Sequence, residues 1–128
     1  MSSATPSPSE TELEILKRFW RDGDLSAREL QQRIAGQLNW TPSTSRTVLE
    51  RMRTKGLLSR RDVHGMAVYS HVHPKVQVLG GLMRRLSAVL EIDALPAAAF
   101  TGSQILTDDE IAELEAMLNR ADEGEDGV

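Results

Sequence analysis

Residues 40–65 constrain the fold more than any other segment, because both ends of a helix are marked there by residues with specific backbone roles. Thr41 is suited to cap the helix N-terminus, and Pro42 follows at the first helical position, where its missing N–H costs nothing. Gly56 is suited to the left-handed conformation that commonly ends a helix. This pattern predicts a helix over residues 42–55.

The same segment concentrates positive charge on a chain that is acidic overall. The whole chain carries a net charge of −4, yet the stretch from Ser43 to Arg61 carries +5. Residues 1–77 hold 12 basic and 8 acidic residues, whereas residues 78–128 hold 3 basic and 11 acidic residues. Only the N-terminal portion therefore has the electrostatics to release counterions from a nucleic acid. The acidic portion would be repelled by DNA and is expected to serve another purpose.

Small polar and basic side chains gather on one side of the predicted helix. At about 100° per residue, its apolar side chains fall on one face, and hydroxyl and guanidinium groups fall on the other. Such groups read base edges and hold phosphates. We expect Thr44, Arg46 and Thr47 to contact bases or groove edges, and Ser43 and Arg51 to contact phosphates.

Glu50 lies on the same face and has two interpretations. Its carboxylate is able to accept a hydrogen bond from cytosine. It is equally well placed for an intrahelical ion pair with Arg46 or Arg53. The sequence does not separate these two roles.

A β-hairpin is predicted directly after this helix. Residues 57–61 and 66–72 have the composition of two short strands, and the turn between them contains glycine. Arg60, Arg61 and His64 fit a wing that touches the DNA backbone or minor groove. For His64, a solvated turn residue without a DNA contact is an equal alternative.

Two helices are predicted before this segment. Each begins with a capping box, the first formed by Ser9 and Glu12 and the second by Ser26 and Glu29. Apolar residues recur at helical spacing in both, and in the second helix this stripe continues to Leu38. Three helices followed by a hairpin are typical of a winged helix-turn-helix, which meets DNA through its last helix.

Two further helices are predicted in the acidic portion. One begins after Pro74, and the other begins at a third capping box, formed by Thr107 and Glu110. Their apolar residues form a seam suited to helix–helix packing. This seam has two interpretations, an intrachain core and a dimer interface. We favour the dimer, because these acidic helices have little else in their own chain to pack on and a single module binds DNA weakly. The predicted dimerisation residues are Val76, Leu79, Met83, Leu86, Leu90, Ile111, Leu114 and Leu118.

The expected fold class is mainly α with a small β-hairpin. Residues 1–8 are predicted to be a disordered arm, and residues 9–73 a winged-helix DNA-binding domain. Residues 74–119 are predicted to be a helical dimerisation region, and residues 120–128 an acidic disordered tail. No apolar run approaches the length of a membrane span, and the N-terminus lacks the apolar core of a signal peptide. We therefore expect a cytoplasmic protein without membrane insertion.

Enzymatic and metal-dependent functions receive little support. The chain has no cysteine, which excludes disulfides, thiol redox sensing and cysteine metal sites. His71 and His73 share one face of a predicted strand, but no third ligand lies near them in sequence. Packing or solvation is favoured for both, so we expect no metal and no other cofactor. No catalytic set is apparent, and an enzyme is the least favoured class.

Three segments resemble the penicillinase-repressor family of winged-helix transcriptional regulators. They are T-E-L-E-I-L-K-R-F-W (11–20), W-T-P-S-T-S-R-T-V-L-E-R-M-R-T-K-G-L-L (40–58) and D-D-E-I-A-E-L-E-A-M-L (108–118). The middle segment is the specific one, because it matches the family's motif of Trp, Ser/Thr, Pro, Thr, Thr, Leu and Lys-Gly at fixed spacing. The matching residues here are Trp40, Thr41, Pro42, Thr44, Thr47, Leu49 and Lys55-Gly56. The resemblance implies a homodimeric repressor that binds a dyad operator through its third helix and dimerises through its C-terminal helices.

Two departures from the family pattern concern the inducing signal. In members that answer to β-lactams, a membrane-anchored sensor protease triggers cleavage at an Asn-Phe bond in the C-terminal section. The corresponding place here is Ala99-Phe100, so the resemblance implies a sensor protease partner but the sequence lacks the expected asparagine. Copper-responsive members carry a cysteine-rich C-terminal motif, which this chain lacks.

The sequence therefore predicts a sequence-specific DNA-binding transcriptional repressor that acts as a homodimer on double-stranded DNA. Two alternatives remain open at this point. One is a winged-helix protein-interaction module that does not bind DNA, against which the local charge of +5 argues. The other is a regulator gated by a small ligand bound among the C-terminal helices, although no residue pattern indicates a pocket. The operator sequence and the inducing signal are not encoded in a readable motif.

Overall fold

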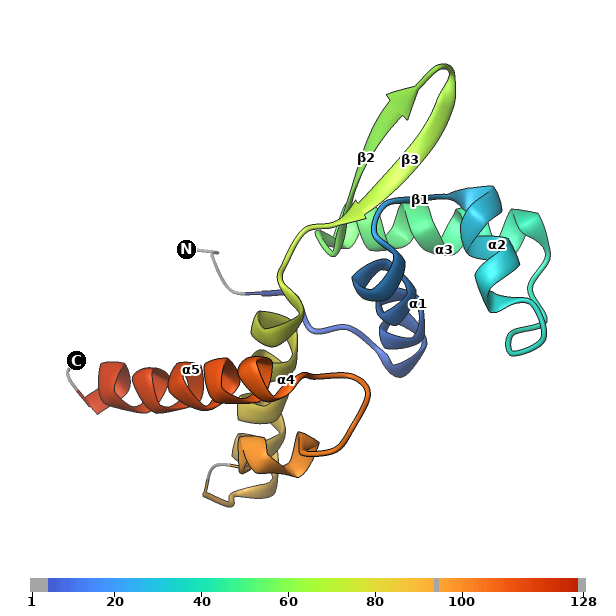
Figure 1. Ribbon diagram of the computed structural model, residues 1–128. Coiled ribbons are helices and arrows are strands. Elements are labelled where there is room, and N and C mark those ends of the chain that lie inside the picture. The colour runs from blue at the N-terminus through green and yellow to red at the C-terminus, as the bar shows by residue number, and fades with distance from the viewer. Residues whose placement is uncertain (1–4, 94, 127–128) are drawn as a thin grey trace. The chain divides into compact units, whose positions relative to one another are not determined.

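The computed structural model describes residues 5–93 and 95–126, with side chains over 5–93 and 95–120. The chain forms two compact units, an N-terminal unit, Pro8–His73, and a C-terminal unit, Pro74–Val128 with Met1–Ser7. In chain order the elements are α1 (Glu10–Asp22), β1 (Leu25–Ser26), α2 (Ala27–Ile34), α3 (Pro42–Lys55), β2 (Leu58–Val63), β3 (Met66–His71), α4 (Lys75–Leu90), the 3₁₀ helix η1 (Ala97–Phe100) and α5 (Asp108–Asp126) (Figure 1). The predicted fold class, mainly α with a small β-hairpin, is confirmed.

Side-chain caps define the ends of the helices in the N-terminal unit. Ser9 caps α1 and Ser26 caps α2, each exchanging two hydrogen bonds with the glutamate three residues later. Thr41 Oγ1 accepts from the backbone N–H of Thr44 at 3.1 Å and caps α3. Gly56 ends α3 at a φ of +93°, in the left-handed region. These predicted helix ends are confirmed. They could be predicted because capping depends on residues that are neighbours in sequence.

The second helix is shorter than its apolar stripe predicts. α2 ends at Ile34 rather than continuing to Leu38. Gly36 adopts a φ of +92°, which turns the chain out of the helix. Leu38 is consequently half-buried in a loop rather than buried on a helix face.

The hairpin belongs to a three-stranded antiparallel sheet with strand order β1-β3-β2. The two-residue strand β1 was not predicted from the sequence, and it pairs Leu25 with Tyr69. β2 and β3 are joined by His64 and Gly65, whose φ values of +52° and +81° are typical of a two-residue hairpin turn. The hairpin extends beyond the helices of its own unit (Figure 1).

The core of the N-terminal unit is mainly aliphatic, with Phe19 and Tyr69 as its aromatic members. The side chains of Phe19, Leu30, Ile34, Leu49 and Met52 have no exposed surface. They come from α1, α2 and α3, so burial of their apolar surface fixes the relative placement of these three helices. Tyr69 from β3 is also buried and brings the hairpin onto the same core.

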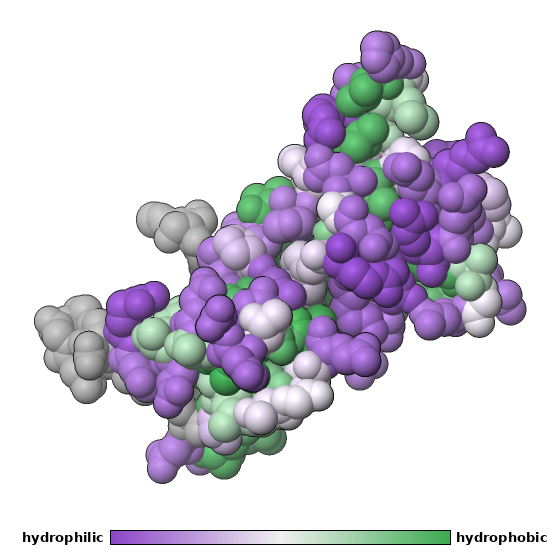
Figure 2. All heavy atoms as spheres, viewed as in Figure 1, coloured by the Kyte–Doolittle hydropathy of each residue, from purple (hydrophilic) through white to green (hydrophobic). Residues whose placement is uncertain are grey.

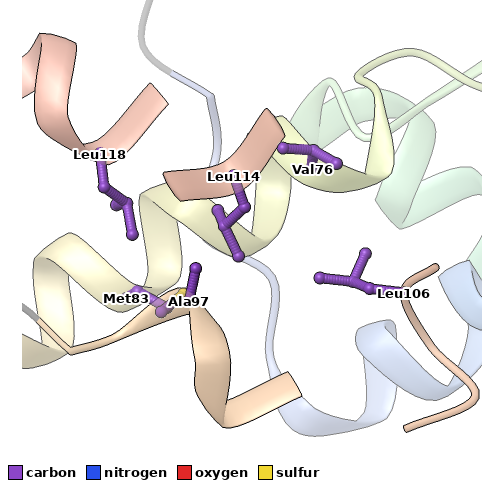
Figure 3. Packing of buried hydrophobic residues seen from close by; sticks show 6 residues of the cluster. All are labelled: Val76, Met83, Ala97, Leu106, Leu114 and Leu118. Carbon is purple, nitrogen blue, oxygen red and sulfur yellow. The ribbon is translucent and has the colours of Figure 1, made fainter. Parts of the chain in front are cut away.

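The C-terminal unit has its own core, formed where α4 and α5 pack together with η1 and the loop before α5. Figure 3 shows its apolar side chains pointing toward one another from these elements. The buried members are Val76, Met83, Ala97, Leu106, Leu114 and Leu118, and Leu79 and Ile111 are partly buried against them. Gly80 of α4 lets α5 approach closely, because a Cβ there would lie 2.3 Å from Met117 Cε.

This packing changes the interpretation of the apolar seam. Four of the predicted dimerisation residues, Val76, Met83, Leu114 and Leu118, are buried against other parts of their own chain. Buried side chains present no surface to a second chain in this fold. The intrachain alternative therefore describes these four residues, since α5 and the preceding loop supply the apolar partners that α4 needs.

The other end of the seam stays exposed. Leu86 is 49% exposed and Leu90 is 55% exposed, and Val89 and Ile92 beside them are 77% and 48% exposed. Apolar residues also lie at the surface of the C-terminal unit in Figure 2. Four large apolar side chains within seven residues form an unusually concentrated exposed set, which we call the α4-end patch.

Parts of the predicted arm and tail lie outside the described residues, namely 1–4 and 127–128. Within the described ranges, Thr5 Oγ1 accepts a hydrogen bond from Gln77 Nε2 at 2.6 Å. α5 carries helical backbone through Asp126, into the segment for which the sequence predicts disorder. No helix in these ranges is both long enough and apolar enough to cross a bilayer.

Leu114→Ala is expected to destabilise the C-terminal unit by about 2–5 kcal/mol, because it removes buried apolar contacts and leaves a cavity. Denaturant unfolding followed by circular dichroism would measure this loss. Glu113→Ala, an exposed change one residue earlier, is the matched control and should shift stability by less than about 0.5 kcal/mol. Equal effects of the two changes would contradict this assignment of the core.

Candidate nucleic-acid interface

The outer face of α3 is open to solvent along its length. Ser43, Thr44, Arg46, Thr47 and Arg51, the residues predicted to contact DNA, are all exposed. The opposite face buries Ser45, Leu49 and Met52 in the unit's core. Hydrophilic side chains also cover much of the visible surface of this unit (Figure 2). The predicted face of α3 is thus presented on a helix whose other face is anchored.

A polar joint between α2 and α3 fixes the N-terminal half of α3. Gln31 accepts a hydrogen bond from the buried Ser45 hydroxyl and donates one to the carbonyl of Trp40 at 2.6 Å. Both partners lie at or near the start of α3. Sequence reasoning did not identify Gln31, because its partners are 9 and 14 residues away in the chain.

Four of the six cations between Ser43 and Arg61 are paired with carboxylates of the same unit. The pairs are Lys55–Glu12 at 2.7 Å, Arg53–Glu50 at 2.9 Å, Arg60–Glu50 at 3.1 Å and Arg61–Asp24 at 2.8 Å. Among the side chains that the structure describes, Arg46 and Arg51 form no ion pair. The guanidiniums most available to an incoming anion are therefore those of Arg46 and Arg51.

Arg28 joins this surface, although it was not among the residues predicted to contact DNA. It is exposed in the first turn of α2 and lines, with Arg46, a hollow of about 310 Å³ beside Pro42 and Gln31. Two guanidiniums and the N-terminal ends of two helices then border one depression. Both cations and helix N-termini favour anions. The sequence around Arg28 did not indicate a DNA contact, because Arg28 lies between Ser26 and Glu29, which form the capping box of α2.

Thr44 has a second role at the start of α3. Its hydroxyl lies 3.0 Å from the hydroxyl of Thr41, and its backbone N–H donates to the same cap. Thr44 is exposed, but its hydroxyl already has a partner within the helix cap. Among the described residues, no hydrogen bond holds the side chains of Arg46 and Thr47 in this way.

Glu50 connects α3 to both long strands of the hairpin. Arg53 donates to Glu50 Oε1 from Nε at 3.0 Å and from Nη2 at 2.9 Å. Arg60 of β2 and Tyr69 of β3 donate to Oε2 at 3.1 Å and 2.5 Å. Of the two roles considered for Glu50, the structure shows the ion pair with Arg53, and it adds two cross-element partners that the sequence could not reveal.

These contacts shift the pKa values of Glu50 and Tyr69 in opposite directions. The hydrogen bond from Tyr69, followed by that from Arg53, lowers the pKa of Glu50 to about 2. Burial and the same hydrogen bond to Glu50 raise the pKa of Tyr69 to about 12. At neutral pH the carboxylate is therefore ionised and the phenol is protonated, which is the arrangement that the hydrogen bonds require.

The N-terminal unit is expected to lose stability in acid partly through Glu50. Because the pKa of this carboxyl is lower in the folded state than its ordinary value of 4.5, its contribution is complete above that value and is lost as the pH falls toward about 2. Denaturant unfolding of wild type and Glu50→Gln between pH 7 and pH 3 would measure this. The stability advantage of wild type should shrink below about pH 4.5, and a pH-independent difference would contradict the assignment.

The remaining predicted wing residues occupy the hairpin. Arg61 Nη1 also donates to Ser70 Oγ at 3.1 Å, which holds its guanidinium beside Asp24. His64 is exposed in the turn. His71 Nδ1 lies 3.1 Å from the carbonyl of His73. Within the described residues, no group of three or more possible ligands is arranged to hold a metal ion.

The fold and this surface together define a class of protein. Helices α2 and α3 are joined by a short connection, α1 packs beside them, and the β2–β3 hairpin follows α3, which is the arrangement of a winged helix-turn-helix. The family model described as "Penicillinase repressor" matches residues 8–120, nearly the whole chain. The chain belongs to the penicillinase repressor family, a family of transcriptional repressors.

A curated relative supports the same family. The protein named "Penicillinase repressor" from Bacillus licheniformis is 29% identical to this chain over 65 residues. That alignment covers 51% of this chain and 51% of the relative. The match thus spans about half the length of the relative.

Proposed function

We propose that this protein is a sequence-specific DNA-binding repressor that acts as a homodimer on a dyad operator. The observation that carries this proposal is the outer face of α3, on which Arg46 and Arg51 are exposed and form no ion pair with described side chains. A capped helix with a buried inner face holds these guanidiniums in fixed positions. Membership of a repressor family supports the same conclusion.

In the proposed complex, α3 enters the major groove. Arg46 is near the helix N-terminus and is long enough to reach a base edge, where a guanidinium pairs in bidentate fashion with guanine. Thr47 lies one residue further along and is suited to an apolar or hydroxyl contact in the same groove. Ser43, Arg51 and Arg28 are assigned to phosphates, which fix register without reading sequence.

The hairpin is proposed to follow the DNA backbone beside the groove. Arg60 and Arg61 are neighbours on β2, so their side chains lie on opposite faces of the hairpin, Arg60 toward Glu50 of α3 and Arg61 toward Asp24. His64 lies at the turn. All three are assigned to phosphates along the backbone. Arg61 must exchange Asp24 for a phosphate in this complex, whereas Arg60 keeps its contact with Glu50 and shares its guanidinium with a phosphate. Both guanidiniums already have carboxylate partners, so the wing contributes less than its formal charge suggests.

The proposed dimer forms through the α4-end patch of Leu86, Val89, Leu90 and Ile92. Arg84 and Arg85 precede this patch, whereas Glu91 lies between Leu90 and Ile92 and Asp93 follows Ile92. When two such helix ends cross in an antiparallel, two-fold arrangement, Arg84 and Arg85 of each copy lie near Glu91 and Asp93 of the other. The charges of this surface are then self-complementary.

The salt dependence of binding to random duplex DNA tests the proposal against a protein-interaction module. A repressor of this kind should bind random duplex weakly, with an affinity that falls steeply as salt rises, because counterions are released. The slope of log affinity against log salt should lose about 0.9 for each phosphate contact removed, for instance by Arg51→Ala. If the protein does not bind duplex DNA at low salt, the proposed function is excluded.

A further inference from the structure

Glu50 occupies an unusual position for an acidic residue. It is the one carboxylate between Ser43 and Arg61, and it lies on a face otherwise composed of hydroxyl and guanidinium groups. A carboxylate there opposes the attraction of a polyanion. Its presence on such a face therefore calls for a role other than electrostatic attraction.

The contacts of Glu50 indicate that role. One oxygen accepts from Arg53 of the same helix, and the other accepts from Arg60 of β2 and from Tyr69 of β3. Tyr69 is itself buried in the core and pairs with Leu25 of β1. The carboxylate thus ties α3 to the wing at a point anchored in the core, and it occupies two guanidiniums at the same time.

We propose that Glu50 is a specificity-determining positioning residue, which fixes the wing against α3 and withholds Arg53 and Arg60 from DNA that lacks the operator sequence. This inference rests on the proposed DNA-binding function. Binding to random DNA comes almost entirely from phosphate contacts, so two neutralised guanidiniums lower it directly. Binding to the operator depends on simultaneous docking of α3 and the wing, which a fixed geometry favours.

Asp62 provides a matched control for the charge of Glu50. Its Oδ1 lies 3.7 Å from Nη2 of Arg60, so it is the second carboxylate beside that guanidinium. Its side chain is 69% exposed on the wing, and no ion pair or hydrogen bond joins it to α3 among the described residues. Asp62→Asn therefore changes the charge by the same amount as Glu50→Gln while leaving the joint between α3 and the wing intact.

The experiment measures affinities for an operator duplex selected from random DNA and for a shuffled duplex, each over a range of salt concentrations. For Glu50→Gln, affinity for the shuffled duplex should rise about 5–10-fold and its salt slope should steepen by about 1. Operator affinity should stay close to that of wild type, so the specificity ratio falls about 5–10-fold. For Asp62→Asn, both affinities should rise together and the ratio should stay unchanged.

Tyr69→Phe separates positioning from charge. It removes the hydroxyl that donates to Glu50 but keeps the ring in the core and the carboxylate on the face. The specificity ratio should fall while the salt slope stays the same as in wild type. Tyr69 is also the one tyrosine in the chain, so its ionisation in ultraviolet absorbance reports on the joint without DNA. In Glu50→Gln the phenol should ionise at lower pH than in wild type.

A specificity ratio in Glu50→Gln equal to that of wild type would overturn the inference and leave the proposed function standing. An unchanged ratio in Tyr69→Phe, or an unchanged Tyr69 ionisation in Glu50→Gln, would also overturn it. Failure of the proposed function has a different signature, because the wild type itself would then fail to distinguish the selected duplex from the shuffled one.

Discussion

Leu90→Asp is expected to convert the protein to a monomer and to reduce operator affinity by about 10²–10⁴-fold. Leu90 lies within the α4-end patch, and a carboxylate there would have to be buried against the apolar surface of the second copy. The loss follows from effective concentration, because two linked modules bind a dyad far more tightly than one. Sedimentation equilibrium and operator titration would measure the two effects.

Val72→Asp is the matched control for this change. Val72 is 46% exposed, close to the exposure of Leu90, but it lies outside the α4-end patch. This variant should keep the oligomeric state of wild type. A dimeric Leu90→Asp protein, or a monomeric wild type that binds its operator tightly, would contradict the proposed interface.

Arg46→Ala is expected to cost about 1–3 kcal/mol of discrimination in each half-site, which amounts to roughly 5–150-fold. Arg46 is exposed near the N-terminus of α3 and forms no ion pair with the described side chains. No internal partner therefore has to be given up before it contacts a base. Affinity for shuffled DNA should fall much less than affinity for the operator.

Arg33→Ala removes the same charge from α2 and serves as the control. Arg33 is paired with Asp22 at 3.0 Å and lies outside the proposed interface. It should affect operator and shuffled DNA equally and only slightly. Equal losses on both duplexes in Arg46→Ala would mean that Arg46 holds a phosphate rather than reads a base.

The parts of the fold that sequence reasoning predicted correctly depend on local chemistry. The starts of α1, α2 and α3 follow from Ser9, Ser26 and Thr41, because a cap bonds to backbone two or three residues away. The hairpin follows from the composition of its strands and the glycine in its turn. Such features require no knowledge of distant contacts.

The features that sequence reasoning missed depend on contacts between distant residues. β1 exists because Leu25 pairs with Tyr69, which lies 44 positions later in the chain. The role of Glu50 depends on Tyr69 and Arg60, which reach it only after the hairpin folds back on α3. Helical periodicity alone also does not reveal which apolar residues of α4 pack on α5 and which stay exposed.

The C-terminal unit holds the Ala99-Phe100 bond, where the family resemblance places an Asn-Phe cleavage site. Ala99 and Phe100 lie in η1, where Ala99 is exposed and Phe100 is packed against the core of the C-terminal unit. The family resemblance implies cleavage by a sensor protease at this place, whereas alanine replaces the expected asparagine. Incubation of Ala99→Asn with such a protease would show whether this residue decides susceptibility.

Selection of bound sites from random DNA tests the central claim most directly, when it is combined with the stoichiometry of the selected complex. A homodimeric repressor should enrich an inverted repeat whose half-sites are centred about 10 base pairs apart, or a small multiple of that spacing, with two chains on each duplex. The absence of any enriched motif, or a single asymmetric site bound by one chain, would contradict it.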